Sequence, residues 1–238
     1  MNQEEVDAFL EANADPAYRR FNERIIPGAG PMAGVRMPLL RKFAGRMMKG
    51  DWRSFLELEP HYYEQKVLKA LVIAEAEMDA QERIRLTEEF SRSISDWGTC
   101  DTLCGSWKID SKQSADMLWD MSVRMLGTGS EFMMRVGTVM MLFHFIDDEH
   151  IGEVVERMRR ISSPGYYCSM GAGWCLSFCY IAYPEMTEEA LRSGCADPEV
   201  LRLAVKKICE SRAVSPADKA RIREEFAPTR SGNRPGKR

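Results

Sequence analysis

The sequence predicts an all-α protein and, within that class, a HEAT-like helical repeat solenoid. Apolar residues recur at helical spacing along almost the whole chain of 238 residues, which is the pattern of amphipathic helices. No segment shows the alternation of β-branched and polar residues that predicts a strand. The helices pair up at about 35 to 45 residues per pair, the period of such solenoids. Because no clean sequence motif repeats with that period, an irregular helical bundle is the alternative.

The chain begins with two short helices. An apolar stripe starts at Val6, and Asp15 followed by Pro16 opens a second helix that runs to Ile25, since a capping side chain before a first-turn proline marks a helix start. The Gly- and Pro-rich segment 27–31 predicts a loop. Further helices are expected over Pro38–Met48, Trp52–Leu58, Tyr62–Glu77, Ala80–Ile94, Trp97–Trp107, Ser111–Leu126, Glu131–Ile146, Ile151–Arg160, Tyr166–Ala182, Thr187–Ser193, Pro198–Ser211 and Pro216–Phe226.

The loops between these helices are short, and no long linker interrupts them. We therefore expect one helical-repeat domain over residues 1–226. Residues 227–238 carry four cations and no acid and offer nothing apolar to bury, so a disordered basic tail is expected there. The formal net charge is −3, and without the tail it becomes −7. An acidic body argues against broad, nonspecific binding of nucleic acid.

Several observations bear on the compartment. The seven cysteines are scattered and odd in number, which does not predict a disulfide framework, and no basic start followed by an apolar run marks a signal peptide. A cytoplasmic protein is the expectation. The segment from Gly165 to Tyr183 carries no charge but contains Gly, Ser and Tyr throughout and lacks basic flanks, so it predicts a helix buried on several sides and not a membrane span.

Trp97 and Asp101 form the most informative pair in the chain. Their four-residue spacing puts the indole and the carboxylate on one helix face, one turn apart. A carboxylate beside a large aromatic is poorly suited to a core, because it needs water or a partner. The pair is better suited to binding something flat or cationic. Trp174, in the uncharged segment, is a candidate third member of the site.

The helix Glu131–Ile146 is apolar nearly all round, yet it contains Arg135. A buried guanidinium needs an anion, either a carboxylate such as Asp101 or a phosphate from a ligand. Two further residues, Gly171 and Gly173, lie inside a predicted helix, where each costs roughly 1 kcal/mol relative to alanine. They indicate close approach, either by another helix or by a nucleic-acid backbone beside Trp174.

Five segments, taken together and in this order, resemble the AlkD-like DNA alkylation repair family, whose members are built from HEAT-like repeats. The likeness extends from about Tyr18 to Phe226, and each motif is weak by itself. The segments are Gly-Val-Arg-Met-Pro-Leu-Leu-Arg at 34–41, Asp-Trp-Gly-Thr-Cys-Asp at 96–101, Met-Arg-Val at 134–136, Ala-Gly-Trp at 172–174 and Val-Lys-Lys-Ile-Cys-Glu-Ser-Arg at 205–212.

This resemblance implies a DNA glycosylase that excises positively charged N3- or N7-alkylated purines from duplex DNA by hydrolysing the N-glycosidic bond without flipping the base. Trp97 and Trp174 would line a concave cleft against the sugar of the lesion nucleotide. Asp101 would stabilise the developing oxocarbenium ion and orient water, and Arg135 would hold a phosphate. A cationic base is already a good leaving group, so no general acid is required.

The predicted DNA-binding residues are basic. A cationic strip on the concave face would favour DNA, and an acidic or apolar one would favour protein. Met170 and Ser177 stand where family members have a lysine and an arginine, so two phosphate contacts are expected to be lost. The candidates for the strip are Arg36, Arg41, Lys66, Lys69, Arg135, Lys206 and Arg212.

Neither a cofactor nor a metal is expected. The protein is expected to be a monomer. The i, i+4 pairs Cys100/Cys104 and Cys175/Cys179 are better explained as small buried apolar groups than as ligands. His144 and His150 flank three acids without a standard metal spacing. Two alternatives to a glycosylase stay open: a catalytically silent binder of damaged or branched DNA, and a helical-repeat scaffold that binds protein.

Overall fold

The structure is a computed structural model that describes residues 2–226. Within this range the chain forms fourteen α-helices and no strand, which confirms the predicted all-α class. The expected basic tail, 227–238, lies outside the described residues. The helices are α1 Gln3–Ala12, α2 Pro16–Ile25, α3 Met37–Met47, α4 Trp52–Leu56, α5 Tyr63–Glu75, α6 Ala80–Ser91, α7 Trp97–Ser106, α8 Lys112–Leu126, α9 Glu131–His144, α10 Ile151–Arg160, α11 Tyr166–Ala182, α12 Pro184–Arg192, α13 Pro198–Glu210 and α14 Pro216–Glu225.

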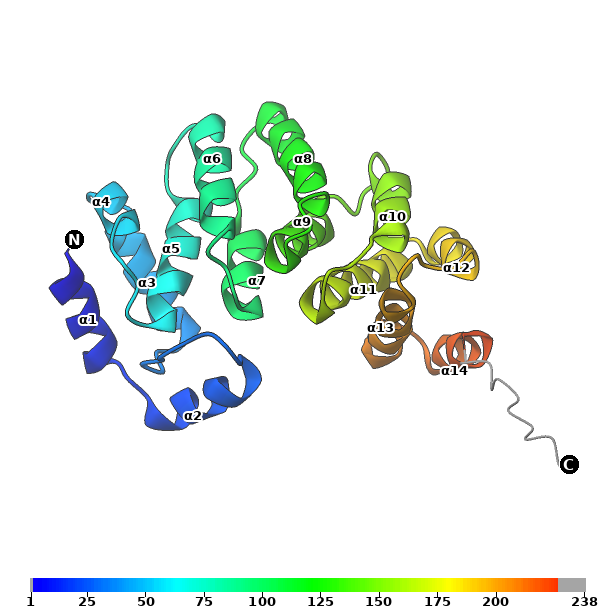
Figure 1. Cartoon of the computed structure of the whole chain (residues 1–238), viewed down its shortest axis with the longest axis horizontal. Coiled ribbons are helices and arrows are strands. Elements are labelled where there is room, and N and C mark those ends of the chain that lie inside the picture. The colour runs from blue at the N-terminus through cyan, green and yellow to red at the C-terminus, as the bar shows by residue number, and fades with distance from the viewer. Residues whose placement is uncertain (1, 227–238) are drawn as a thin grey trace, which may run out of the picture.

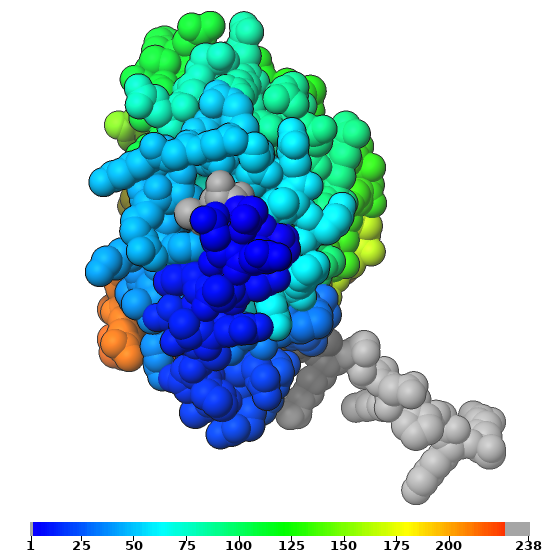
Figure 2. Space-filling view, turned by 90° about the vertical axis from the view of Figure 1, so that its left-hand side faces the viewer, coloured from blue at the N-terminus to red at the C-terminus, as the bar shows by residue number. Residues whose placement is uncertain are grey.

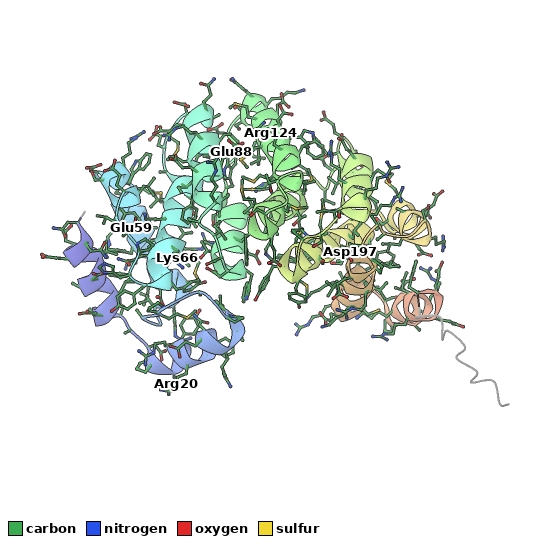
Figure 3. All side chains as sticks on the ribbon, viewed as in Figure 1. Arg20, Glu59, Lys66, Glu88, Arg124 and Asp197 are labelled. Carbon is green, nitrogen blue, oxygen red and sulfur yellow. The ribbon has the colours of Figure 1, made fainter. Side chains whose placement is uncertain are left out.

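The helices are arranged in two layers along an arc (Figure 1). In the inner layer α3, α5, α7, α9, α11 and α13 each pack on the next. The outer layer contains α6 packed on α8, and α10 packed on α12. Figure 3 labels one link within that outer layer, the ion pair of 2.6 Å between Glu88 of α6 and Arg124 of α8. This stacking of successive helices agrees with a helical repeat solenoid.

Some helix ends differ from the sequence-based ranges. Helix α12 begins at Pro184, three residues before the predicted Thr187, because Tyr183 precedes a first-turn proline whose missing N–H costs nothing there. Helix α6 ends at Ser91 and not at Ile94. The cap-and-proline signal at Asp15 and Pro16 was correct, because Asp15 accepts from the Ala17 and Tyr18 N–H groups at the start of α2.

The core lies between the layers and is continuous through α5. This helix contributes Leu71 and Val72 to an N-terminal apolar cluster, and Ala70 and Ile73 to the larger cluster that extends to Ile222. Helices α9 and α11 are buried on most sides. As expected for α11, no helix among the described residues is long and apolar enough to cross a membrane.

The N-terminal end of the arc is closed by α1 and α2, which form the near face in Figure 2. The connection from α2 to α3 is held by Glu64 of α5, a fully buried carboxylate that accepts from the backbone N–H groups of Ala33, Gly34 and Val35 at 2.6–3.2 Å. Gly34 has φ of +89°, and a Cβ there would lie 2.5 Å from the Asp15 carbonyl oxygen. The 34–41 motif therefore has a structural role, which places α2 at one wall of the arc.

Candidate functional site: an aromatic cleft around a buried ion pair

A cleft of about 470 Å³ opens on the inner side of the arc. Its walls come from the end of α2 and from α7, α9, α11 and α13, so residues more than 180 positions apart in the sequence meet there. We call it the inner cleft, and it brings together the three residues Trp97, Asp101 and Trp174, whose convergence the sequence could not show. Its lining comprises Arg24, Ile25, Pro27, Trp97, Asp101, Arg135, Tyr166, Tyr167, Met170, Trp174 and Lys207.

Three features fix the start of α7, where Trp97 lies. Its indole Nε1 donates to the Ile25 carbonyl oxygen at 2.8 Å, which ties α7 to the end of α2. Asp96 caps the helix by accepting from the Thr99 N–H at 2.7 Å. A Cβ on Gly98 would lie 2.3 Å from the Tyr63 hydroxyl oxygen, so only glycine fits between them. Because the indole N–H is already used, Trp97 offers the cleft only its ring.

Asp101 and Arg135 form the charged centre of the inner cleft. The Arg135 Nη2 donates to both carboxylate oxygens of Asp101, at 2.9 and 3.0 Å, and Nε donates to one at 3.2 Å. Its Nη1 donates to the Tyr167 carbonyl oxygen at 2.9 Å. Of the two partners that the sequence left open for Arg135, the structure shows the carboxylate. Such a bidentate pair holds both groups in one orientation.

The two partners differ in exposure. The Arg135 side chain is 4% exposed and that of Asp101 is 19% exposed, so the carboxylate is the member that can contact a ligand. Burial raises the pKa of Asp101 above the ordinary value of 3.8, and Arg135 opposes that rise without cancelling it. The site therefore presents an anion with little water around it, which strengthens its interaction with any nearby positive charge.

Trp174 forms the opposite side of the inner cleft, and its indole has aromatic neighbours. Its ring meets those of Phe143 and Phe178 edge to face, with centroids 5.9 and 6.0 Å apart. Ser177, considered above as a lost phosphate contact, is buried, and its Oγ donates to the Trp174 carbonyl oxygen at 2.7 Å. Its side chain does not face the cleft and offers no contact to a phosphate there, so the lost contact at Ser177 stays a prediction. Met170 does line the cleft.

The two glycines of α11 serve helix packing. A Cβ on Gly171 would lie 2.4 Å from the Thr138 Oγ1 of α9, and one on Gly173 would lie 2.8 Å from the Leu203 Cβ of α13. Both glycines are buried. Of the two interpretations of these residues, close approach of helices is therefore correct. The alternative of a wall open to a nucleic-acid backbone is wrong.

The predicted basic strip is mostly engaged within the protein. Arg36 pairs with Asp15 at 2.8 Å and Arg41 with Glu75 at 2.9 Å. Lys66 and Lys69 donate to backbone carbonyl groups, Lys206 lies 3.8 Å from Glu210, and Arg212 is exposed. Of the seven candidates only Arg135 lines the inner cleft.

Two further cations line its walls, Arg24 of α2 and Lys207 of α13, and the sequence did not single out either as a DNA-binding residue. Lys207 pairs with Glu210 at 3.2 Å. The Arg24 guanidinium lies 6.0 Å from the centre of the Phe21 ring, and within residues 2–226 it forms no ion pair. Nothing in the local sequence distinguishes Arg24 from other surface arginines, because only the folding of α2 toward α7 places it at the cleft.

The cysteine pairs and the histidines do not form a metal site in the described part of the chain. No group of three potential ligands is close enough to hold an ion. Cys100, Cys104, Cys175 and Cys179 are buried and unpaired, as expected of small apolar residues. His144 binds the Cys104 carbonyl oxygen at 2.8 Å, and burial lowers its pKa.

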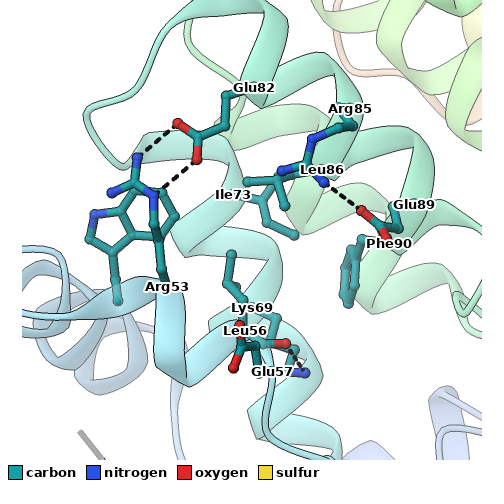
Figure 4. A pocket seen from close by; sticks show the side chains of 11 residues that line it. Arg53, Leu56, Glu57, Lys69, Ile73, Glu82, Arg85, Leu86, Glu89 and Phe90 are labelled. Atoms are coloured by element: carbon teal, nitrogen blue, oxygen red, sulfur yellow. Dashed lines mark hydrogen bonds and ion pairs between the residues drawn. The ribbon is translucent and has the colours of Figure 1, made fainter.

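A second hollow of similar size, about 460 Å³, lies between α4, α5 and α6. We call it the α4–α6 groove. Its arginines are paired along the walls, Arg53 with Glu82 at 2.8 Å and Arg85 with Glu89 at 2.9 Å (Figure 4). The cations are therefore already neutralised by acids on the same surface, and the groove offers no net charge for a phosphate.

The family model described as DNA alkylation repair enzyme matches residues 6–208. That span includes every residue that lines the inner cleft, and the chain therefore belongs to the DNA alkylation repair enzyme family. No individual curated protein matches it.

Proposed function

We propose that the protein is a DNA glycosylase that releases positively charged N3- or N7-alkylated purines. One observation carries this proposal: Trp97, Asp101 and Trp174 line one cleft, and Arg135 orients the carboxylate at its centre. An anion between two indoles suits a flat group that becomes cationic. A deoxyribose has these properties while its base departs.

The proposed chemistry is hydrolysis of the N-glycosidic bond. The bond to the base breaks and its electron pair leaves with the alkylated purine, which thereby loses its positive charge. The sugar becomes an oxocarbenium ion, which the Asp101 carboxylate stabilises at short range. Water then adds at C1′ and its proton is lost, with Asp101 as the nearest acceptor in the cleft. Arg135 acts as a positioning residue, because its hydrogen bonds keep the carboxylate in place.

The walls of the cleft support a nucleotide ligand. Arg24 on α2 and Lys207 on α13 lie on different walls, where they would contact backbone phosphates on either side of the sugar. Met170 of α11 also lines the cleft and adds apolar surface in place of a third cation. We therefore expect that both the affinity for DNA and its dependence on salt are lower than in a cleft with a cation at that position.

The test is the release of 7-methylguanine from methylated duplex DNA. We expect release by the wild type and a loss of about a hundredfold or more in Asp101→Asn, by analogy with the removal of one electrostatic group from other active sites. Glu82→Gln in the α4–α6 groove is the matched control and should release the base at the wild-type rate. Circular dichroism verifies that each variant is folded at the assay temperature.

Two outcomes would favour the other candidates. Duplex binding without release by the wild type would indicate a catalytically silent binder. No binding at low salt would indicate a protein scaffold. Unchanged release by a folded Asp101→Asn protein would contradict the catalytic role of Asp101.

A further inference from the structure

Two residues of α9 bind the backbone of Tyr167 at the start of α11. The Glu131 Oε1 accepts from the Tyr167 N–H at 2.6 Å, and the Arg135 Nη1 donates to the Tyr167 carbonyl oxygen at 2.9 Å. Glu131 and Arg135 are four residues apart, so both side chains leave the same face of α9. Tyr167 lines the inner cleft, whereas Glu131 does not. The second residue of α11 is therefore fixed from α9 at both of its backbone groups.

Helix α11 lacks a capping side chain of its own. Its N-cap residue is Gly165, which makes no side-chain hydrogen bond to the first turn, although the first N–H groups of a helix have no partner within it. The Glu131 carboxylate supplies one acceptor from the neighbouring helix. A Cβ on Gly165 would lie 2.4 Å from the Glu131 Oε1, so a side chain at this position would displace the carboxylate. The glycine therefore leaves room for a cap that comes from α9.

The turn that Glu131 caps carries part of the wall of the inner cleft. Tyr166 and Tyr167 both line the cleft, and Met170 follows one turn later. The Tyr167 ring also packs on the ring of Phe132, the neighbour of Glu131, with centroids 5.1 Å apart. Side chains in the first turns of α9 therefore set the position of this wall.

The Tyr167 carbonyl oxygen is one of two acceptors that orient the Arg135 guanidinium. The other is Asp101, which accepts from Nε and Nη2 at 2.9–3.2 Å. A planar guanidinium that is bound on both sides has a fixed plane, and it holds the carboxylate in one orientation. A shift of the Tyr167 peptide would turn that plane, and the Asp101 carboxylate would turn with it.

We propose that Glu131 is a positioning residue for Asp101, which acts through the Tyr167 peptide and Arg135. This inference rests on the proposed function, because it takes Asp101 as the group that stabilises the sugar cation. Glu131 itself does not contact the substrate. It accepts the N–H that fixes the Tyr167 peptide, the carbonyl oxygen of Tyr167 fixes Arg135, and Arg135 fixes the carboxylate.

Three substitutions of Glu131 separate its hydrogen bond from its charge. Glu131→Gln removes the charge and keeps an oxygen that can accept from the Tyr167 N–H. Glu131→Ala removes both, and Glu131→Asp keeps the charge on a side chain that is one methylene too short. Single-turnover base release at saturating protein should fall about tenfold in the Ala and Asp variants and stay near the wild-type rate in Glu131→Gln, because misplacing a reacting group by 1 Å costs up to about a hundredfold. The half-saturating protein concentration should not change, since Glu131 does not contact DNA.

Asp79→Ala is the matched control. Asp79 caps α6 by accepting from the Glu82 N–H at 2.8 Å, and it does not line the inner cleft. The variant loses the same kind of cap as Glu131→Ala, so it should lower the Tm by a similar amount without changing base release. Circular dichroism verifies that each variant is folded, and Glu131→Asp takes the place of Glu131→Ala if the alanine protein does not fold. Equal losses of release in Asp79→Ala and Glu131→Ala would overturn the assignment, because lower stability alone would then explain them.

The pKa of Asp101 in the DNA-free protein reports on the same contacts without catalysis, and NMR titration of ¹³C-labelled aspartate measures it. Burial raises this pKa and Arg135 opposes the rise. Glu131→Ala and Glu131→Gln lose the same charge, so a difference between them measures the position of Arg135. The pKa of Asp101 should be higher in Glu131→Ala than in Glu131→Gln. The other titratable or charged groups around Asp101 are Asp96 and Cys100 of α7, Tyr63 of α5, Arg24 of α2, Tyr166 and Tyr167 of α11 and Lys207 of α13.

The two proposals can fail separately. Release of 7-methylguanine by the wild type, with equal rates and equal Asp101 pKa values in the Ala and Gln variants, would keep the glycosylase and remove the role of Glu131. Its charge at the start of α9 would then be its only contribution. No release by the wild type, with a higher Asp101 pKa in Glu131→Ala than in Glu131→Gln, would remove the catalytic function and keep Glu131 as the residue that positions the ion pair.

Discussion

The inner cleft and the α4–α6 groove are almost equal in volume, about 470 and 460 Å³. They differ in how their charged side chains are paired and how far these are buried. In the groove, the exposed Arg53 and Arg85 pair with Glu82 and Glu89 of α6, so the surface neutralises itself. In the inner cleft, one buried pair lies among aromatic rings, and Arg24 on the wall has no acidic partner among the described residues. The comparison teaches that the desolvation and local pairing of charge, and not the size of a hollow, distinguish a candidate active site from a surface groove.

The largest expected effect concerns the buried ion pair. Arg135→Met leaves the Asp101 carboxylate without its partner, which should lower the free energy of unfolding by about 3–5 kcal/mol. Arg53→Met removes an exposed partner of Glu82 and should leave the midpoint of urea unfolding nearly unchanged. The double variant Asp101→Asn/Arg135→Met should regain most of the loss, because no charge remains unpaired. Equal midpoints for the Arg135 and Arg53 variants would contradict the contrast between the two hollows.

The second prediction concerns the wall behind the inner cleft. Gly173→Ala would place a Cβ 2.9 Å from the Ala204 backbone nitrogen, so α11 and α13 must move apart, at a cost of about 1–3 kcal/mol. Gly45→Ala in α3 meets nothing within 4 Å and should stabilise the protein by about 1 kcal/mol through helix propensity. Thermal unfolding measures both. A stabilising Gly173→Ala would show that the two helices do not limit the space there.

The third prediction concerns pH. Asp101 must be ionised to stabilise a cationic sugar, and burial raises its pKa above 3.8. Base release should therefore fall as the pH decreases through that raised pKa, so the midpoint of the acid limb lies above 3.8. The free energy of unfolding should change with pH in the opposite direction to base release. The folded protein binds this proton more tightly than the unfolded chain, so Asp101 stabilises the fold most at low pH, and this contribution is lost as the pH rises through the raised pKa. A single-turnover pH profile with an acid midpoint at or below 3.8 would argue against Asp101.

The smallest expected effect is on DNA affinity, when a cation on the wall of the inner cleft is removed. Arg24→Ala removes a cation without an acidic partner among residues 2–226, so duplex affinity should fall by a few fold and the slope of log K against log salt by about one. Arg85→Ala, which removes a paired cation of the α4–α6 groove, should change neither. Binding titrations at several salt concentrations measure both slopes, and identical slopes would place the phosphates elsewhere.

Much of the fold follows from local sequence. The helical spacing of apolar residues, the Asp and Ser caps and the first-turn prolines predicted the helices, because these signals act within one or two turns. The one-turn spacing of Trp97 and Asp101 put them on a common face for the same reason. The start of α12 was missed because Pro184 was not used as a start signal, although Pro16 was.

What the sequence by itself determined was therefore the helices, the all-α class and the residues with the chemistry of a site. Only the tertiary structure decided that Arg135 pairs with Asp101, that Gly171 and Gly173 admit neighbouring helices, that Ser177 is buried, and that Arg24 lines the inner cleft. Each of these depends on partners more than 25 residues away along the chain, except for Ser177, whose burial depends on how α11 is rotated in the core. Periodicity and capping report on neighbouring turns, whereas the partner of a buried charge is selected by which helices stack.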